Sequence, residues 1–468
     1  MPISVDLKAL TATYVDNKSV FKHKTGEKIW LFPFVTNDKS AKNEIACELK
    51  DFRGISGEAL RLHTSQELPP RFGQEMIIDN ASEKVTTSEK AAFKKIIKQV
   101  CFGDSDNIYR FSKKSLLYQQ VQNSQKTLNS FAEYIVEVFL ENKELDFEEN
   151  DSEVVLYKLL NAAMPKLKKV PVKRNNNCYL GLGKIRELFA NDLAILQKDN
   201  HLFINNFDKL LKYYLYFYLT QLVFKLKNKF SAQSEHSALF YSVDWEPLSE
   251  SREAYTYGLK LIQEQVKEIF PHVVCLELLH HIEGIGERKF VYSELKERIN
   301  SFSDEEKSDL LQAVKVIYKF YVESLKDVNW DLFERQYKSS GDTTLLEAVN
   351  KLHQAIYFQF SITSRGRASE GYGKWILEFG RQNFGKRRGR LGYTHALTQD
   401  YILLFIKLCV GSSSEEKIRL SGLWEQLECR GIHFDLFSKQ EIITFLDKNN
   451  MLEKKSDSGD AQYVTVQG

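Results

Sequence analysis

Basic and aromatic residues are interleaved in one segment near the end of the chain, from Ser364 to Gly392. Eight lysine and arginine residues stand against two glutamates, so the segment carries a net charge of +6 while the whole chain carries +2. Arginine binds phosphate oxygens through paired hydrogen bonds, and aromatic rings stack on bases. This pattern predicts a phosphate-contacting, DNA-binding segment whose cations are Arg365, Arg367, Lys374, Arg381, Lys386, Arg387, Arg388 and Arg390.

The glycines and aromatic rings of this segment agree with DNA binding but do not distinguish it from binding to a protein. Seven of the 23 glycines of the chain lie in the segment, and glycine lets a backbone approach a ligand closely. A mobile basic loop that docks an acidic partner protein would have the same composition, so both alternatives stay open. The aromatic residues concerned are Tyr372, Trp375, Phe379 and Phe384.

Motifs for nucleotide hydrolysis, zinc chemistry and serine nucleophiles are missing from the sequence. A phosphate-binding loop needs a lysine followed by serine or threonine, which Gly181–Arg186 and Gly371–Trp375 lack. His280 and His281 are adjacent, so on a helix they would point about 100° apart, unlike the histidines of a zinc protease. Gly54–Gly57 has the wrong spacing for a nucleophile elbow. We therefore expect no catalytic residues, no metal and no cofactor.

One acidic triplet formally matches a magnesium nuclease. Glu48-Leu49-Lys50 follows Asp38, and two carboxylates could hold the ion while the lysine assists the reaction. Such triplets arise readily by chance when 27% of the residues are charged, and no second motif supports this one. A cryptic magnesium nuclease is therefore the less favoured alternative.

Length and composition indicate an ordinary globular protein of several folding units. The chain has 468 residues, of which 43% are hydrophobic, enough to bury a large core. Its 65 lysines and arginines are balanced by 63 acidic residues, which excludes a histone-like protein that is basic all over. Any contact with nucleic acid must come from a local patch.

Several features predict a cytoplasmic protein that does not cross a membrane. The six cysteines are far apart in the sequence, unlike those of a secreted disulfide scaffold. The first residues lack the basic and apolar regions of a signal peptide. The most apolar stretch is free of charge only from Tyr213 to Phe224, far short of the ~20 residues that span a bilayer.

The distribution of proline predicts where helices dominate. All eight prolines lie in the first 271 residues, so the rest of the chain can run in helices without a built-in breaker. Lys28–Val35 and Ile45–Phe52 read as strands or extended segments. An acidic run followed by a basic, proline-containing stretch marks a surface connection near residues 145–177. Apolar periodicity predicts further helices at 88–102, 130–140, 188–195, 207–230, 253–270, 292–299, 303–325 and 344–360.

The last 70 residues carry the pattern of a winged helix-turn-helix. Predicted helices at 399–410 and 420–427 are followed by a turn at 431–435, a helix at 440–448 opened by a capping box at Ser438, and a strand hairpin. In such a module the third helix enters the major groove. Here that helix has balanced charges, so the module could equally dock a protein.

Three stretches in this region resemble the C-terminal end of the DptG family, the G subunit of the bacterial DNA-phosphorothioation-dependent restriction system. They are Arg390–Thr394, Trp424–Asp435 and Leu452–Val464. The resemblance implies a cytoplasmic complex in which companion F and H subunits supply ATP-driven and cleavage functions. That complex attacks DNA without the sulfur-for-oxygen backbone mark of the host. The family offers no catalytic residues to transfer to this chain.

Together these observations predict a mainly α, multi-domain protein. We expect a mixed α/β N-terminal region at 1–145, a helical domain at 178–362, the basic Gly/Arg-rich segment at 363–392 and a winged-helix-like domain at 393–468. The predicted function is a non-catalytic DNA-binding and scaffolding subunit of a restriction complex in antiviral defence. Its expected partners are double-stranded DNA and the F and H subunits. A purely protein-docking adaptor is the first alternative.

Overall fold

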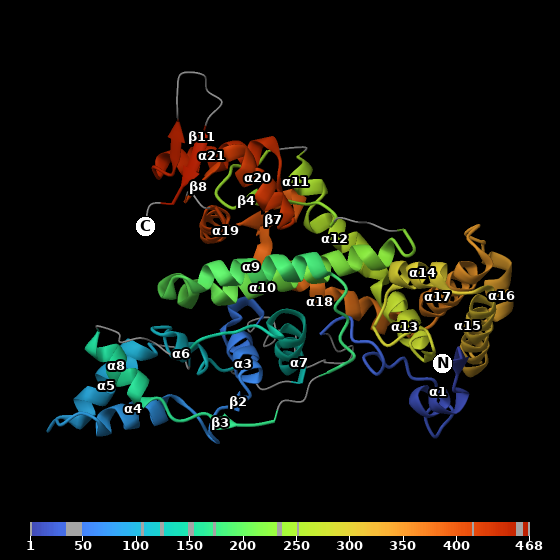
Figure 1. Cartoon of the computed structure of the whole chain (residues 1–468), viewed down its shortest axis with the longest axis horizontal. Coiled ribbons are helices and arrows are strands. Elements are labelled where there is room, and N and C mark those ends of the chain that lie inside the picture. The colour runs from blue at the N-terminus through green and yellow to red at the C-terminus, as the bar shows by residue number, and fades with distance from the viewer. Residues whose placement is uncertain are drawn as a thin grey trace.

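A computed structural model of the 468-residue chain gives its fold (Figure 1). It describes residues 2–33, 49–103, 107–121, 126–147, 154–171, 175–231, 236–249, 252–413, 416–454 and 462–466. Most of these residues are helical, and the strands among them form small sheets of two to four strands. The prediction of a mainly α, multi-domain fold is confirmed.

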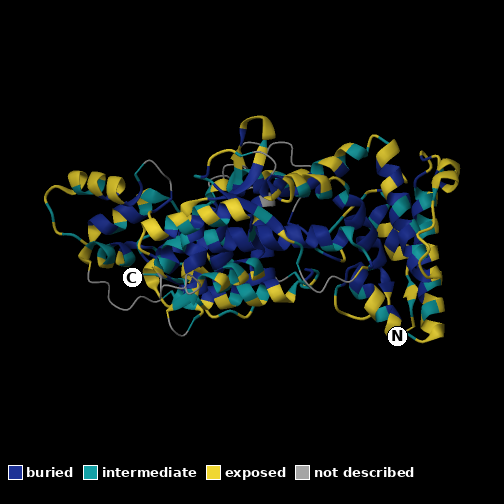
Figure 2. Ribbon diagram, turned by 90° about the horizontal axis from the view of Figure 1, so that it is seen from above, coloured by how far each residue is buried: buried dark blue, intermediate teal, exposed yellow. Residues whose placement is uncertain are grey.

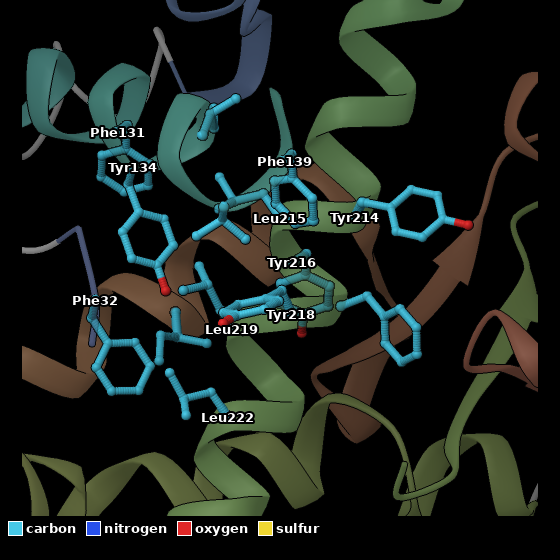
Figure 3. Packing of buried hydrophobic residues seen from close by; sticks show 14 of the residues in the cluster. Phe32, Phe131, Tyr134, Phe139, Tyr214, Leu215, Tyr216, Tyr218, Leu219 and Leu222 are labelled. Atoms are coloured by element: carbon cyan, nitrogen blue, oxygen red, sulfur yellow. The ribbon is translucent and has the colours of Figure 1, made fainter. Parts of the chain in front are cut away.

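The long helix α10 (Asn200–Lys227) lies at the centre of the molecule (Figure 1). Every residue from Leu210 to Phe224 is buried, because other helices surround α10 on several sides. Figure 3 shows its tyrosines and leucines packed against Phe32, Tyr134 and Phe139. A helix that is apolar all round belongs to a protein core. Within the described part of the chain, no helix has the length and apolar character needed to span a membrane.

Short helices between residues 53 and 163 cover one side of α10 (Figure 1). Two-residue strands β2 (Gln66–Glu67) and β3 (Lys168–Lys169) pair antiparallel beside them. Strands are therefore rarer here than in the mixed α/β region that we predicted. The helices are α3 (Arg53–His63), α4 (Gln74–Glu83), α5 (Lys90–Cys101), α6 (Lys113–Leu116), α7 (Lys126–Ile135), the π-helix η1 (Val136–Leu140) and α8 (Val155–Ala163).

The first residues of the chain pack elsewhere, against the helical domain. Strand β1 (Ser4–Val5) pairs with β5 (Ile282–Glu283), and α1 (Leu7–Tyr14) follows it. The buried carboxylate of Glu277 accepts backbone N–H groups of Gly26, Lys28 and Ile29. These contacts fix the N-terminal loop to the helix that carries Glu277.

The helical domain follows the predicted periodicity closely. Ser303 and Glu306 form the predicted capping box at the start of α15. The predicted helix at 253–270 is instead divided into several pieces. The elements are α9 (Gly183–Gln197), α11 (Glu253–Thr256), α12 (Leu259–Gln265), the 3-10 helix η2 (Val266–Glu268), α13 (Ile269–Leu279), α14 (Tyr292–Ser301), α15 (Asp304–Ser324), α16 (Trp330–Gln336) and α17 (Thr344–Ile362).

A four-stranded sheet joins the helical domain to the C-terminal elements. Its order is β6-β7-β4-β9, in which β4 (Leu239–Val243) lies parallel to β7 (Tyr393–Leu397) and to β9 (Ile432–Phe434). Strand β6 (Gly385–Arg387) pairs antiparallel with β7. Residues more than 140 positions apart are thus side by side in this sheet, and the buried core runs through both regions (Figure 2).

The three C-terminal helices occur in the predicted order, but the predicted turn at 431–435 instead contains strand β9, which pairs with β4. Helices α19 (Gln399–Gly411), α20 (Leu420–Cys429) and α21 (Leu436–Lys448) surround a three-stranded antiparallel sheet of order β10-β11-β8. Its strands are β8 (Lys417–Arg419), β10 (Leu452–Lys454) and β11 (Gln462–Thr465).

Two further local predictions are wrong. Helix α21 begins at Leu436, four residues earlier than predicted, because the carboxylate of Asp435 accepts the N–H of Ser438. Ser438 is therefore inside the helix and caps nothing. The predicted strand at 45–52 is also wrong where it can be tested, since residues 49–51 are helical. Residues 34–48 lie outside the described residues.

Candidate nucleic-acid interface

The basic segment is a helix followed by a tight hairpin. Helix α18 spans Gly366–Phe384. Its glycines serve close contact within the protein: a Cβ added to Gly373 would lie 2.2 Å from the carbonyl oxygen of Val266. At Gly380 it would lie 2.5 Å from the hydroxyl of Tyr216. The expectation that these glycines open the backbone to a ligand is therefore wrong.

Three of the four aromatic residues in the segment belong to the core. Tyr372, Phe379 and Phe384 are 2%, 0% and 0% exposed, and the ring of Phe384 stacks on Tyr216 with 5.0 Å between centroids. Only Trp375 is partly exposed. Rings and charged residues alternate in the sequence because the rings face the core and the charged side chains face solvent. The expected base stacking is therefore wrong for the three buried residues.

Arg388 is a structural residue, which corrects its prediction as a phosphate contact. It is 6% exposed and donates hydrogen bonds to the carbonyl oxygens of Glu246 (2.8 Å) and Val243 (2.9 Å). A longer one reaches the hydroxyl of Ser242 (3.3 Å). Its guanidinium group thus links the basic segment to β4 and to the residues that follow β4.

Two further arginines are partly occupied by contacts within the protein. Arg365 forms an ion pair with Asp327 at 2.8 Å, and this pairing lowers the pKa of Asp327. Arg381 lies 5.8 Å above the ring of Tyr393 and 3.9 Å from the carboxylate of Glu378. Both arginines are less available to a phosphate than fully exposed cations.

Three cations remain exposed in the segment from β6 to β7: Lys386 and Arg387 on β6, and Arg390 in the turn that follows. We call residues 385–393 the basic hairpin. Gly389 and Gly392 adopt positive φ angles of 53° and 75°, a conformation that favours glycine. They turn the chain tightly on either side of Arg390. Lys386 and Arg387 point to opposite faces of β6, because successive residues of a strand alternate.

Two of the three exposed cations of the basic hairpin have no internal partner among the described residues. In the described part of the chain, Arg387 and Arg390 make no ion pair, while Lys386 donates to the carbonyl oxygen of Asp244 at 2.5 Å. Burial raises the pKa of Asp244, against the attraction of Lys386. Lys50 is exposed nearby and lines a hollow of about 460 Å³ together with Arg381. The hairpin can therefore contact several phosphates without reading bases.

Arg367 lies near the amino end of α18 and Lys374 near its middle. Both are exposed and share a helix face with Glu370, Glu378 and Arg381, because these positions recur every three or four residues. The charges on that face alternate in sign. The eight predicted cations therefore do not form one continuous strip.

The C-terminal module presents apolar residues where base contacts would be expected. Leu436 and Phe437, at the start of α21, are 87% and 37% exposed. The guanidinium of Arg252 lies 4.5 Å from the Phe437 ring and pairs with buried Asp435 at 2.5 Å. Burial alone would raise the pKa of Asp435, but hydrogen bonds from Arg252 and Ser438 lower it. Exposed apolar residues of this kind suit a protein partner.

The other chemistry considered above gains no support. Within the described residues, no group of three histidine, cysteine or acidic side chains could hold a metal. Asp38 and Glu48 of the formal nuclease motif lie outside those residues. His281 is buried and its Nε2 lies 2.9 Å from the Tyr14 hydroxyl, a core contact.

Comparisons with known proteins add no relative. No protein-family model matches the chain, and no curated protein sequence matches it either. What the chain does must be inferred from its own residues.

Proposed function

We propose that this protein is a non-catalytic DNA-binding and scaffolding subunit of a bacterial restriction complex. In this proposal it is cytoplasmic and binds double-stranded DNA. Following the resemblance at its C-terminal end, the complex acts in phosphorothioation-dependent defence. Companion F and H subunits supply the ATP-driven and cleavage functions.

The observation that carries the proposal is the basic hairpin. Lys386 and Arg387 on β6 and Arg390 on the following turn are exposed within five residues of one another, while the intervening Arg388 is anchored inside. A rigid turn keeps the cations in position before DNA binds, which lowers the entropy lost on binding. Charged residues on the edge strand β6 would also discourage pairing with a foreign strand, so a binding assay is needed to separate the two roles.

The direct experiment measures duplex affinity by fluorescence anisotropy at low salt. The variant Lys386→Gln, Arg387→Gln, Arg390→Gln is expected to bind DNA at least tenfold more weakly. A matched control, Lys90→Gln, Lys95→Gln, Lys315→Gln, removes the same charge from exposed positions elsewhere. Equal affinity of the wild type and the hairpin variant would refute DNA binding at this site.

A protein-docking adaptor is the second candidate, favoured by exposed Leu436 and Phe437. If α21 docks a partner subunit, Leu436→Ser should weaken assembly with the F and H subunits and leave duplex affinity unchanged. If α21 instead approaches DNA, the same substitution should change duplex affinity. The two functions can coexist, because the basic hairpin and α21 are separate surfaces.

A further inference from the structure

A groove of about 740 Å³ opens at the amino end of α18. We call it the α18 groove. Its walls are η2 with the start of α13, the end of α17, and the first half of α18. This volume lies within the range of sites for small organic ligands, about 300–1,000 Å³. It is distinct from the basic hairpin, which follows the other end of the same helix.

Three cations line the α18 groove: Lys267, Arg367 and Lys374. Each is exposed, and none forms an ion pair with another described residue. Two carboxylates also line the groove. Burial would raise the pKa of Glu268, but the ammonium group of Lys227 and the hydroxyl of Tyr357 lower it, so Glu268 is neutralised by a partner of its own. Glu370 is the remaining acidic group, and it faces the same space.

The amino end of α18 adds a favourable electrostatic contribution for an anion. No side chain caps this end, and the first turn contains no acidic residue, so the helix dipole favours a negative ligand. The N–H groups of Gly366 and Ala368 already donate to the carbonyl oxygens of Thr363 and Arg365. Ser369 lines the groove, is 6% exposed, and its hydroxyl has no hydrogen-bond partner among the described residues. The residue is mostly buried, but its hydroxyl is accessible from the groove and is free to donate a hydrogen bond to a ligand there.

The rest of the lining combines polar residues with apolar and aromatic ones. Tyr357 is 37% exposed, and Phe360, Pro271 and Leu377 also line the groove. Aromatic side chains accept planar rings by stacking. Cations for phosphate groups and an aromatic ring for a base are the two requirements of a nucleotide site.

We propose that the α18 groove binds a nucleotide. Its phosphate groups contact Lys267, Arg367, Lys374 and the amino end of α18, with Ser369 donating a hydrogen bond. The base lies against Tyr357. Binding does not require hydrolysis, and the site is independent of the DNA contact proposed for the basic hairpin.

Isothermal titration calorimetry of the full-length protein with ADP, GDP, CDP and UDP tests the site. At least one of them is expected to bind with 1:1 stoichiometry and a Kd of about 100 μM or tighter. Lys374→Gln and Arg367→Gln should each weaken binding roughly tenfold. Glu370→Gln should strengthen binding roughly threefold, since it removes the one unneutralised anion. An increase in affinity cannot result from misfolding.

The same charge-matched control, Lys90→Gln, Lys95→Gln, Lys315→Gln, should bind like the wild type. The proposal is wrong if none of the four nucleotides binds at millimolar concentration, if the control weakens binding as much as the groove variants, or if Glu370→Gln weakens it. Competition by short DNA strands identifies the source of the nucleotide. Displacement only by 5′-phosphorylated strands assigns the groove to strand ends, and no displacement assigns it to free nucleotides.

The basic hairpin variant separates this site from DNA binding. It should keep full nucleotide affinity while losing duplex affinity, and Lys374→Gln should do the reverse. If the nucleotide proposal is wrong, the DNA-binding proposal is therefore not affected, and the reverse also holds.

Discussion

Arg387 and Arg388 are neighbours in the sequence with opposite surroundings. Arg387 is exposed and has no ion pair within the described residues, whereas Arg388 is 6% exposed and binds carbonyl oxygens from residues 243 and 246. The same contrast extends to Arg252 and Arg430, which are buried beside carboxylates. A basic composition therefore does not identify phosphate contacts. Exposure and the absence of an internal partner show which cations are available to a ligand.

Buried arginines in this protein donate hydrogen bonds to carboxylate or carbonyl oxygens. A buried histidine without a carboxylate beside it stays neutral. Arg430 reaches Asp192 at 2.6 Å and 2.9 Å, and Tyr214 donates to the same carboxylate. His395 is fully buried next to the Tyr216 hydroxyl, and burial lowers its pKa to about 3. The interior thus tolerates a charge only where its partner is already in place.

Acid should have the largest effect on stability. Burial lowers the pKa of His395 and also those of His272 and His353. Below pH ~6.5 the unfolded chain binds protons that the folded chain cannot, so stability falls as the pH drops from there toward the folded pKa values. Each such histidine costs about 1.4 kcal/mol per pH unit in that window. Urea unfolding at pH 7.5, 6.5 and 5.5 measures this, and equal stability at all three would contradict it.

Arg430→Met should have the next largest effect. It leaves the carboxylate of Asp192, which is 0% exposed, without its cation, at a cost of about 3–5 kcal/mol. Because Arg430 connects α20 to α9, we expect one cooperative transition to shift as a whole. Chemical denaturation followed by circular dichroism measures it. Separate melting of the C-terminal residues would show that this pair does not couple the two regions.

Arg388→Gln should destabilise the protein by about 2–3 kcal/mol, since several hydrogen bonds from a buried charged group are lost. The salt dependence of DNA binding by the folded protein should not change. Urea unfolding and anisotropy titrations on the same preparation test both statements. If Arg388→Gln altered the salt dependence of DNA binding but kept wild-type stability, Arg388 would be a phosphate contact after all.

The sequence predicted the long, periodic helices such as α10, α15 and α17, but it did not predict that residues 366–384 form helix α18. The capping box of Ser303 and Glu306 also depends only on local residues. By contrast, the start of α21 was missed because Ser438 resembles a cap in sequence. In the structure its hydroxyl bonds to Arg252 and Glu246, nearly 190 residues away in the chain.

The surroundings of Arg388 and of two glycines in α18 were not foreseen for a similar reason. Gly373 and Gly380 look like a flexible segment until Val266 and Tyr216 are placed against them. Arg388 is indistinguishable from its neighbours until β4 supplies its acceptors. These contacts are long-range, and residue type and spacing in one segment cannot reveal them.

Leu436→Ser should change stability by no more than about 0.5 kcal/mol, because the side chain is 87% exposed. Its effect should be on assembly with companion subunits, measured by size-exclusion chromatography of the reconstituted complex. Retained assembly would remove the support that this residue gives to the adaptor role.

The salt dependence of duplex binding tests the central claim most directly. Each phosphate neutralised by a cation contributes about 0.9 to the slope of log affinity against log salt. The variant Lys386→Gln, Arg387→Gln, Arg390→Gln should therefore reduce the magnitude of that slope by about 2.7, with folding stability unchanged within ~0.5 kcal/mol. The control at Lys90, Lys95 and Lys315 should keep the wild-type slope. A wild-type slope in the hairpin variant would contradict DNA contact through the basic hairpin.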